Sequence, residues 1–259
     1  MVVSKIKTAF MKKIILGFTL ITAMVFYSCE KQSDVAVSPS TSSTGIGGSM
    51  ARFTIVGNHL YLADDRSLKV YKISNGAVPQ FVQSVPIGNS IETIYPYNNQ
   101  LFIGSQLGMY IYSLTDPENP AKLGQALHVR SCDPVVAKDS FAFVTLRSGT
   151  RCGTATNALY TYNVKNVMAP MPIDTLLLPT PAGLGYKDTT LFVCCENSGL
   201  AIINIKDAKN PFIKKYITSN TFYDVIALGN TLVCMVKTGI DLYDITDVNN
   251  MQLIKSIPN

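Results

Sequence analysis

Tryptophan is missing from this 259-residue chain, and histidine occurs only twice. The chain also lacks a Cys-x-x-Cys motif and a histidine cluster, which excludes the usual zinc sites. His59 falls in an expected turn, so a Ser-His-Asp triad has no support. The spacing Asp-x-Asp-x-Asp is absent as well, and Asp64-Asp65 is left as the alternative for a calcium-stabilised loop. We expect no metal and no cofactor.

The body of the chain lacks an excess of charge of either sign. The formal net charge is +5, but four lysines lie within residues 1–28, where no Asp or Glu occurs. Without that segment, 18 basic residues stand against 17 acidic ones. A nearly neutral body gives no electrostatic basis for binding nucleic acid.

The N-terminal apolar run is too short to span a membrane. Ile14–Tyr27 comprises 14 residues, whereas a membrane-spanning helix needs about 20. Lys12 and Lys13 precede the run, so the pattern predicts a signal peptide over residues 1–28. The following Phe26-Tyr27-Ser28-Cys29 resembles a bacterial lipobox, which implies acylation of Cys29. An ordinary secretory signal is the alternative.

Residues 29–49 read as an acylated cysteine and a flexible linker. The segment is rich in Ser, Thr and Gly, and two or three acyl chains hold a protein stably at a membrane where one does not. Glu30 follows the cysteine. Because Asp at that position signals retention at the inner membrane, we expect a lipid-anchored protein of the bacterial cell envelope, in the outer membrane.

A short apolar run recurs about every 41 residues after the linker. Its first residues are Leu60, Leu101, Phe141, Leu191 and Leu232, at spacings of 41, 40, 50 and 41. Each copy divides into four short stretches of β-branched, aromatic and alternating apolar residues, strands A to D. Polar pairs such as Asn98-Asn99 separate strand A from strand B, and Asx/Pro segments such as Asp116–Pro120 follow strand C.

Five copies of a four-stranded unit predict an all-β fold, a five-bladed β-propeller over residues 50–259. Stacking around an axis buries the two faces that each sheet alone would expose. A β-sandwich is the alternative, but it does not explain so even a period. The missing Trp-Asp dipeptide and the lack of Gly-Gly pairs in the repeats argue against the WD40 and kelch types. The unit starts at strand A and ends at strand D, which favours ring closure by packing over a swapped strand.

The strand C segments carry a resemblance to a known family. Met109–Asp116, Leu200–Asp207 and Ile240–Asp247 are similar to the LVIVD repeat of bacterial and archaeal cell-surface proteins. The resemblance covers about residues 50–259 and implies a propeller at the cell surface. That family has no established activity, so the resemblance implies no chemistry.

Antiparallel strands place the B–C loops and the D–A connections on one face of a propeller, the loop face. Loops from every blade converge there, so this face is the usual ligand site. Nine polar residues on it are candidates for ligand binding: Glu92, Arg130, Asp133, Arg147, Arg151, Glu196, Asn197, Tyr223 and Asp224. Asp133 and Asp224 occupy equivalent places, and capping of local turns is the alternative role for both.

The cysteines divide into two groups. Cys152 lies in the long B–C loop of the third copy, and Cys132 lies at its D–A entry. In an exported protein this pair is a disulfide candidate, with two free thiols as the alternative. Cys194, Cys195 and Cys234 fall in strand B segments, where we expect small core residues.

Two classes of function fit this sequence. The first is a binding or scaffold module whose loop face holds a protein or a glycan of the envelope. The second is a glycoside hydrolase-like enzyme, with an acid and a base among the channel carboxylates Glu92, Asp133, Glu196 and Asp224. That chemistry needs two carboxyl groups about 5–9.5 Å apart, a distance that a sequence does not contain.

Overall fold

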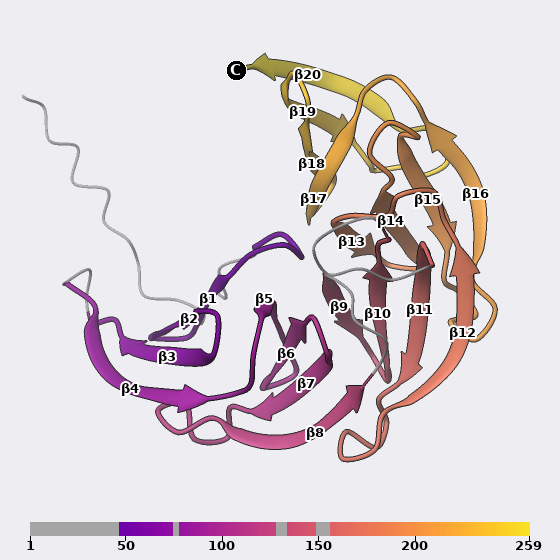
Figure 1. Cartoon of the computed structure of the whole chain (residues 1–259). Helices are drawn as coiled ribbons and strands as arrows, with labels where there is room; N and C mark the ends of the chain where they lie inside the picture. The colour runs from indigo at the N-terminus through magenta and orange to yellow at the C-terminus, as the bar shows by residue number, and fades with distance from the viewer. Residues whose placement is uncertain (1–46, 75–77, 128–133, 149–155) are drawn as a thin grey trace, which may run out of the picture. The chain divides into compact units, whose positions relative to one another are not determined.

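The computed structural model describes residues 47–74, 78–127, 134–148 and 156–259. These residues form five antiparallel four-stranded sheets, and the strands of each sheet follow one another in the chain. The sheets are arranged as a five-bladed β-propeller with the blades in chain order (Figure 1). The predicted fold class is confirmed. The described residues contain no helix, hence none that could cross a membrane.

The twenty strands are short, and each blade runs from an inner to an outer strand. Blade 1 holds β1 (Phe53–Val56), β2 (His59–Ala63), β3 (Ser67–Lys72) and β4 (Gln80–Pro86). Blade 2 holds β5 (Ile91–Tyr97), β6 (Gln100–Ser105), β7 (Gly108–Ser113) and β8 (Ala121–Leu127). Blade 3 holds β9 (Val135–Lys138), β10 (Phe141–Leu146), β11 (Ala158–Asn163) and β12 (Met171–Leu177). Blade 4 holds β13 (Leu184–Lys187), β14 (Thr190–Cys194), β15 (Leu200–Asn204) and β16 (Phe212–Ile217). Blade 5 holds β17 (Phe222–Leu228), β18 (Thr231–Val236), β19 (Gly239–Asp244) and β20 (Gln252–Pro258).

The A–B turns form where the sequence predicts them, except in blade 3, where Lys138 belongs to β9 and the turn comprises Asp139 and Ser140 instead of Lys138 and Asp139. Each A–B turn contains a residue with positive φ, namely Gly57, Asn98 and Asn99, Asp139, Asp188 or Gly229, as tight hairpins require. After strand C, the Asp116 carboxylate accepts the backbone N–H of Glu118, and the Asp207 carboxylate accepts that of Lys209. These Asx turns stop the strand and direct the chain into strand D.

One β-bulge recurs at the same place in every blade. The register between the third and fourth strands shifts after Val70, Ile111, Thr161, Ile202 and Leu242. A bulge increases the local twist of a strand. The repeated bulge therefore adds twist between the third and fourth strands of each blade.

Each sheet has two faces, a leading face toward the next blade and a trailing face toward the previous one. In blade 4 the leading face carries Phe192 and Leu200, which pack on the trailing face of blade 5 at Leu232 and Cys234. The other neighbouring pairs, 1–2, 2–3 and 3–4, bury their facing residues in the same way. Cys194 and Cys195 lie on opposite faces of blade 4, and with Cys234 they are buried free thiols, as predicted.

The alignment of the third repeat differs from the prediction by one residue. Phe141 pairs with Lys138 as Gln100 pairs with Tyr97, so Ala142 rather than Phe141 is equivalent to Leu101. An aromatic residue at the strand start resembles the first core position, but hairpin pairing sets the register. The spacings therefore become 41, 41, 49 and 41.

The junction of the first and last blades differs from the other four. Phe53 of blade 1 and Ile240 of blade 5 are 57% and 40% exposed, although their equivalents in the inner blades are buried. Closure by packing of these two faces, which the repeat boundaries favour, is not what the structure shows. The chain joins the ends near the axis instead, through residues 48–51.

Candidate functional site

Arg147 and Glu196 form an ion pair on the loop face. Arg147 follows β10 of blade 3 and Glu196 follows β14 of blade 4, so the pair bridges two blades. Both side chains are partly exposed, and solvent weakens the stabilisation that such a pair gives. The sequence predicts both residues as ligand-binding candidates, and the structure brings them together.

The backbone around Glu196 orients its side chain. The residue has a φ of 43°, and its carbonyl accepts the N–H groups of Gly199 and Phe222 at 3.0 and 3.2 Å. Asn197, the next residue, accepts a hydrogen bond from the Thr221 hydroxyl at 2.9 Å. Residues from blades 3, 4 and 5 therefore meet at one partly exposed polar cluster, formed by Arg147, Glu196, Asn197 and Thr221.

Asp224 lies in β17, the inner strand of blade 5, and contacts the segment that precedes blade 1. The Ser49 hydroxyl donates to its carboxylate at 3.3 Å, and the backbone N–H groups of Val225 and Met50 donate as well. The same Ser49 oxygen accepts the N–H of Leu184 in blade 4 at 2.7 Å. Ser49 is 1% exposed. These contacts tie the entry segment to blades 4 and 5 at the axis.

Two glycines enclose the Asp224 carboxylate. A side-chain carbon added at Gly48 or at Gly183 would lie 2.1 Å from one of its oxygens. Burial raises the pKa of Asp224 to about 6, although the hydrogen bonds from Val225, Met50 and Ser49 favour the ionised form. The geometry assigns this carboxylate to holding the entry segment against blade 5, which is a long-range structural role rather than the capping of a local turn that was the alternative to ligand binding.

The remaining predicted residues do not join this cluster. Glu92, at the start of β5 in blade 2, accepts a hydrogen bond from Gln106 at 3.2 Å. The backbone carbonyl of Tyr223 accepts the N–H of Gly183 at 2.9 Å. The other predicted residues, Cys29, Arg130, Cys132, Asp133, Arg151 and Cys152, lie outside the described residues.

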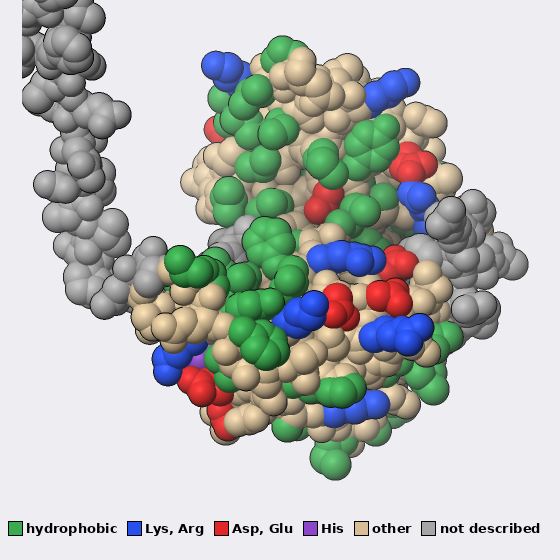
Figure 2. Space-filling view, turned by 60° about the vertical axis from the view of Figure 1, so that its left-hand side comes forward, with side chains coloured by type: hydrophobic (Ala, Val, Ile, Leu, Met, Phe, Trp, Pro, Cys, Tyr) green, Lys and Arg blue, Asp and Glu red, His purple; other side chains and the backbone are tan. Residues whose placement is uncertain are grey.

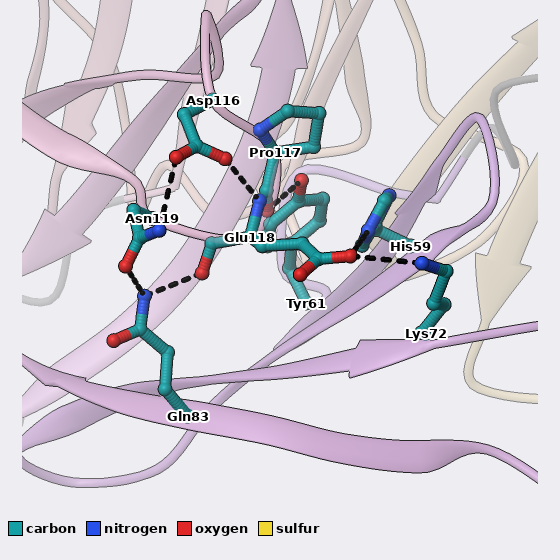
Figure 3. Close-up of polar contacts among 8 residues, drawn as sticks. All are labelled: His59, Tyr61, Lys72, Gln83, Asp116, Pro117, Glu118 and Asn119. Carbon is teal, nitrogen blue, oxygen red and sulfur yellow. Dashed lines mark hydrogen bonds and ion pairs between the residues drawn. The ribbon is translucent and has the colours of Figure 1, made fainter.

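A polar network on the opposite face joins blades 1 and 2, and sequence reasoning did not find it (Figure 3). The Glu118 carboxylate lies 3.0 Å from Lys72 Nζ and 3.6 Å from His59 Nε2. The Tyr61 hydroxyl donates to the carbonyl of Pro117 at 2.8 Å, and burial raises the Tyr61 pKa. The ion pair with Lys72 lowers the pKa of Glu118.

A cleft of about 460 Å³ lies beside this network, lined by His59, Tyr61, Leu114, Pro117 and the A–B turns of both blades. A smaller cleft of about 170 Å³ takes the equivalent place between blades 2 and 3. The clefts repeat with the blades, and the polar groups bridge neighbouring sheets. We therefore interpret both clefts as parts of the interfaces between blades rather than as ligand sites. Among the described residues no group of three metal-ligating side chains occurs.

Comparisons with known proteins identify the fold alone. Neither a protein-family model nor a curated protein sequence matches the chain. A functionally unknown protein from Desulfotomaculum acetoxidans superposes with a TM-score of 0.64 at 11% identity, over 83% of this chain and 69% of its own. A protein from Lactobacillus plantarum gives 0.59 at 12% identity, over 78% and 68%. AztD from Citrobacter koseri gives 0.54 at 13% identity, over 81% and 69%.

Proposed function

We propose that this protein is a binding module of the bacterial cell envelope, held by a lipid on Cys29, whose loop face binds a protein or a glycan. The observation that carries the proposal is the cluster of Arg147, Glu196, Asn197 and Thr221. Three blades contribute to it, and it mixes a cation, a carboxylate and neutral hydrogen-bonding groups. Such a surface suits a polar macromolecular ligand. The chain beyond residue 28 has almost no net charge, which argues against nucleic acid as the ligand.

Hydrolysis of a glycoside is the second candidate function, because Glu92, Glu196 and Asp224 all belong to the propeller. All three carboxylates already have protein partners: Gln106 donates to Glu92, Arg147 pairs with Glu196, and Ser49 donates to Asp224. An acid and base pair must both reach the scissile bond from opposite sides. The enclosed position of Asp224 therefore favours binding over hydrolysis.

Reversing the charge at Arg147 tests the loop face. We expect Arg147→Glu to weaken binding at least about tenfold, equal to about 1.4 kcal/mol, because like charges then meet at Glu196. Binding is measured to purified peptidoglycan, to outer-membrane polysaccharide and to immobilised envelope proteins of the host. The melting temperature should change little, since partly exposed ion pairs contribute about 0–1 kcal/mol.

Lys72→Glu is the matched control, since it reverses another partly exposed ion pair, with Glu118, on the opposite face. Binding that falls equally in both variants would count against a site on the loop face. Release of reducing sugar from the same glycans would favour the hydrolase instead.

Substitution of Cys29 tests the anchor. We expect Cys29→Ser to move the protein from the membrane fraction to the soluble fraction, because the acyl chains that hold it can no longer be attached. Mass spectrometry of the mature wild-type amino terminus should show the lipid. An unmodified amino terminus in wild-type protein would refute the proposed lipid anchor at Cys29.

A further inference from the structure

Lysine occupies one position of the turn between strands C and D, the C–D turn, in blades 3 and 4 only. Lys165 and Lys206 are the second residues after strand C in these blades, and the other blades carry Ser74, Thr115 and Thr246 at the same place. The backbone N–H of each lysine donates to the side-chain oxygen of the asparagine two residues earlier, at 2.9 Å in both blades. The two turns therefore have the same local geometry, and both lysines are exposed.

Exposed apolar side chains accompany the two lysines. Met171 and Phe212 are the first residues of strand D in blades 3 and 4, and they are 63% and 54% exposed. Met168, in the C–D turn of blade 3, is 75% exposed. The other blades begin strand D with a polar or small residue, namely Gln80, Ala121 or Gln252. Grouped apolar side chains that face water mark a contact surface.

The two C–D turns belong to neighbouring blades, on the face opposite to the loop face. The outer-strand residues Leu176 and Ile213 pack against one core cluster between blades 3 and 4, so the outer parts of these blades meet. Lys209, also exposed, lies in the C–D turn of blade 4, where blade 2 has Glu118. We name six side chains of these turns and strand starts the C–D patch: Lys165, Met168, Met171, Lys206, Lys209 and Phe212.

Positive charge gathers at the C–D patch. Residues 164–174 and 205–215, which span it, contain five lysines and two aspartates. The equivalent segments of blades 1, 2 and 5, residues 73–83, 114–124 and 245–255, contain two lysines and three acidic residues. On the face that Figure 2 shows, basic and acidic side chains lie next to one another. Together, blades 3 and 4 therefore present an excess of positive charge at their C–D turns, which the other three blades do not.

A bilayer with anionic headgroups suits both properties of the patch. Its headgroup layer attracts lysine, and the adjoining hydrocarbon accepts apolar side chains that protrude from a protein surface. The patch holds lysines alone, and the described arginines, Arg52, Arg66 and Arg147, all lie on the loop face. Arginine binds single phosphates or carboxylates through paired hydrogen bonds, whereas lysine acts as a point charge. Lysines alone therefore suit the diffuse charge of many headgroups better than one defined acidic partner.

We propose that the C–D patch contacts the surface of a bilayer that contains anionic phospholipids. The three lysines lie at the headgroups, and Met168, Met171 and Phe212 enter the boundary with the hydrocarbon. The loop face then points away from the bilayer, toward the ligand proposed above. The patch consists of side chains of the propeller itself, so the contact does not depend on whether Cys29 carries a lipid.

An anchor at Cys29 is compatible with this orientation. The step from Cys29 to Gly47 covers 18 residues, which span up to about 60 Å when extended. The longest strands of the propeller have seven residues and are about 23 Å long. The entry segment at the axis is therefore within reach of a bilayer on either face.

A tryptophan at position 212 tests the contact. The chain contains no tryptophan, so the fluorescence of Phe212→Trp reports on that site alone. Phe81→Trp is the matched control, because Phe81 is 59% exposed on β4 of blade 1. Both variants of the purified mature protein are combined with vesicles of phosphatidylglycerol and phosphatidylethanolamine. We expect the emission of Phe212→Trp to shift to shorter wavelength and to be quenched by lipids brominated in their acyl chains, while that of Phe81→Trp stays unchanged.

Two lysine substitutions in the Phe212→Trp protein test the charge. Lys165→Gln with Lys206→Gln should lower the ratio of docked to free protein about thirtyfold, which is about 1 kcal/mol for each lysine near an anionic surface. Lys122→Gln with Lys255→Gln removes the same charge from blades 2 and 5 and should change this ratio little. Vesicles of phosphatidylcholine alone should abolish docking, as should salt at about 1 M, where the Debye length is about 3 Å.

The other outcomes overturn the proposal. An unshifted reporter at position 212 would mean that the patch does not touch the bilayer, even where the protein sediments with the vesicles through a lipid on Cys29. The two proposals therefore fail separately. Equal shifts at positions 212 and 81 would show adhesion without a preferred face. A shift that requires added envelope protein or nucleic acid would assign the patch to an acidic macromolecule instead.

Discussion

Replacing Leu200 by alanine should lower the free energy of unfolding by about 2–5 kcal/mol, whereas Ile240→Ala should lower it by about 1 kcal/mol or less. The two residues occupy the same place in blades 4 and 5, the first residue of β15 and the second of β19. Leu200 is fully buried against blade 5, and Ile240 is 40% exposed.

The reason is the difference between a cavity and a surface. Removing Leu200 leaves a void among close-packed side chains, which costs the lost transfer energy and the cavity. Removing Ile240 leaves no such void, because among the described residues its side chain is 40% exposed to solvent. Urea unfolding of both variants and of the wild-type protein measures the two changes. Equal losses would mean that blade 5 packs on another sheet of the same chain.

The difference in the free energy of unfolding between the wild-type protein and Asp224→Asn should change by about 2 kcal/mol between pH 4 and pH 7. Burial raises the pKa of Asp224 to about 6 in the folded protein, whereas an unfolded chain loses this proton near pH 4. The folded state thus binds the proton more tightly. The stabilisation is complete below about pH 4 and is lost as the pH rises through 6.

Paired urea titrations of the two proteins at several pH values measure this difference. The pairing is needed because hydrogen bonds from neighbouring groups lower the pKa values of Asp64 and Asp116. The stabilisation from these two residues is lost as the pH falls, whereas that from Asp224 is lost as the pH rises. The contributions of Asp64 and Asp116 are the same in both proteins, so they cancel in the difference. A difference that stays constant with pH would show that the carboxylate is hydrated rather than enclosed by Gly48 and Gly183.

Local features of the fold could be predicted from the sequence because short segments determine them. The positive φ at Gly57 or Asp139 follows from hairpin chemistry, and the alternation of core residues follows from the pleat. The register of blade 3 could not be read in this way, since Phe141 is as apolar as the residues that truly begin the core.

Features that depend on distant contacts were beyond prediction. Ser49 lies in a Ser- and Gly-rich stretch that reads as linker, and its burial follows from Leu184 and Asp224, which are far away in the chain. Met235 and Ile240 are apolar like their buried counterparts. Nothing in one repeat encodes the curvature that leaves them uncovered.

The contacts within the candidate site could be predicted only in part, for the same reason. Composition and topology placed Arg147, Glu196 and Asn197 on the loop face, and the structure joins Arg147 to Glu196. The pairing of particular side chains across blades depends on loop geometry, which the repeat pattern does not contain. The anchor at Cys29 and the disulfide between Cys132 and Cys152 remain predictions.

A crystal structure of the mature protein tests the central claim most directly, through the contacts of Phe53 and Ile240. We predict five sheets in chain order around one axis, with the leading faces of blades 1 to 4 packed on the trailing face of the next blade, and with Phe53 and Ile240 contacting no other blade of their own molecule. Two facing sheets, or a ring in which blade 5 buries Ile240 against Phe53 of blade 1, would contradict the account.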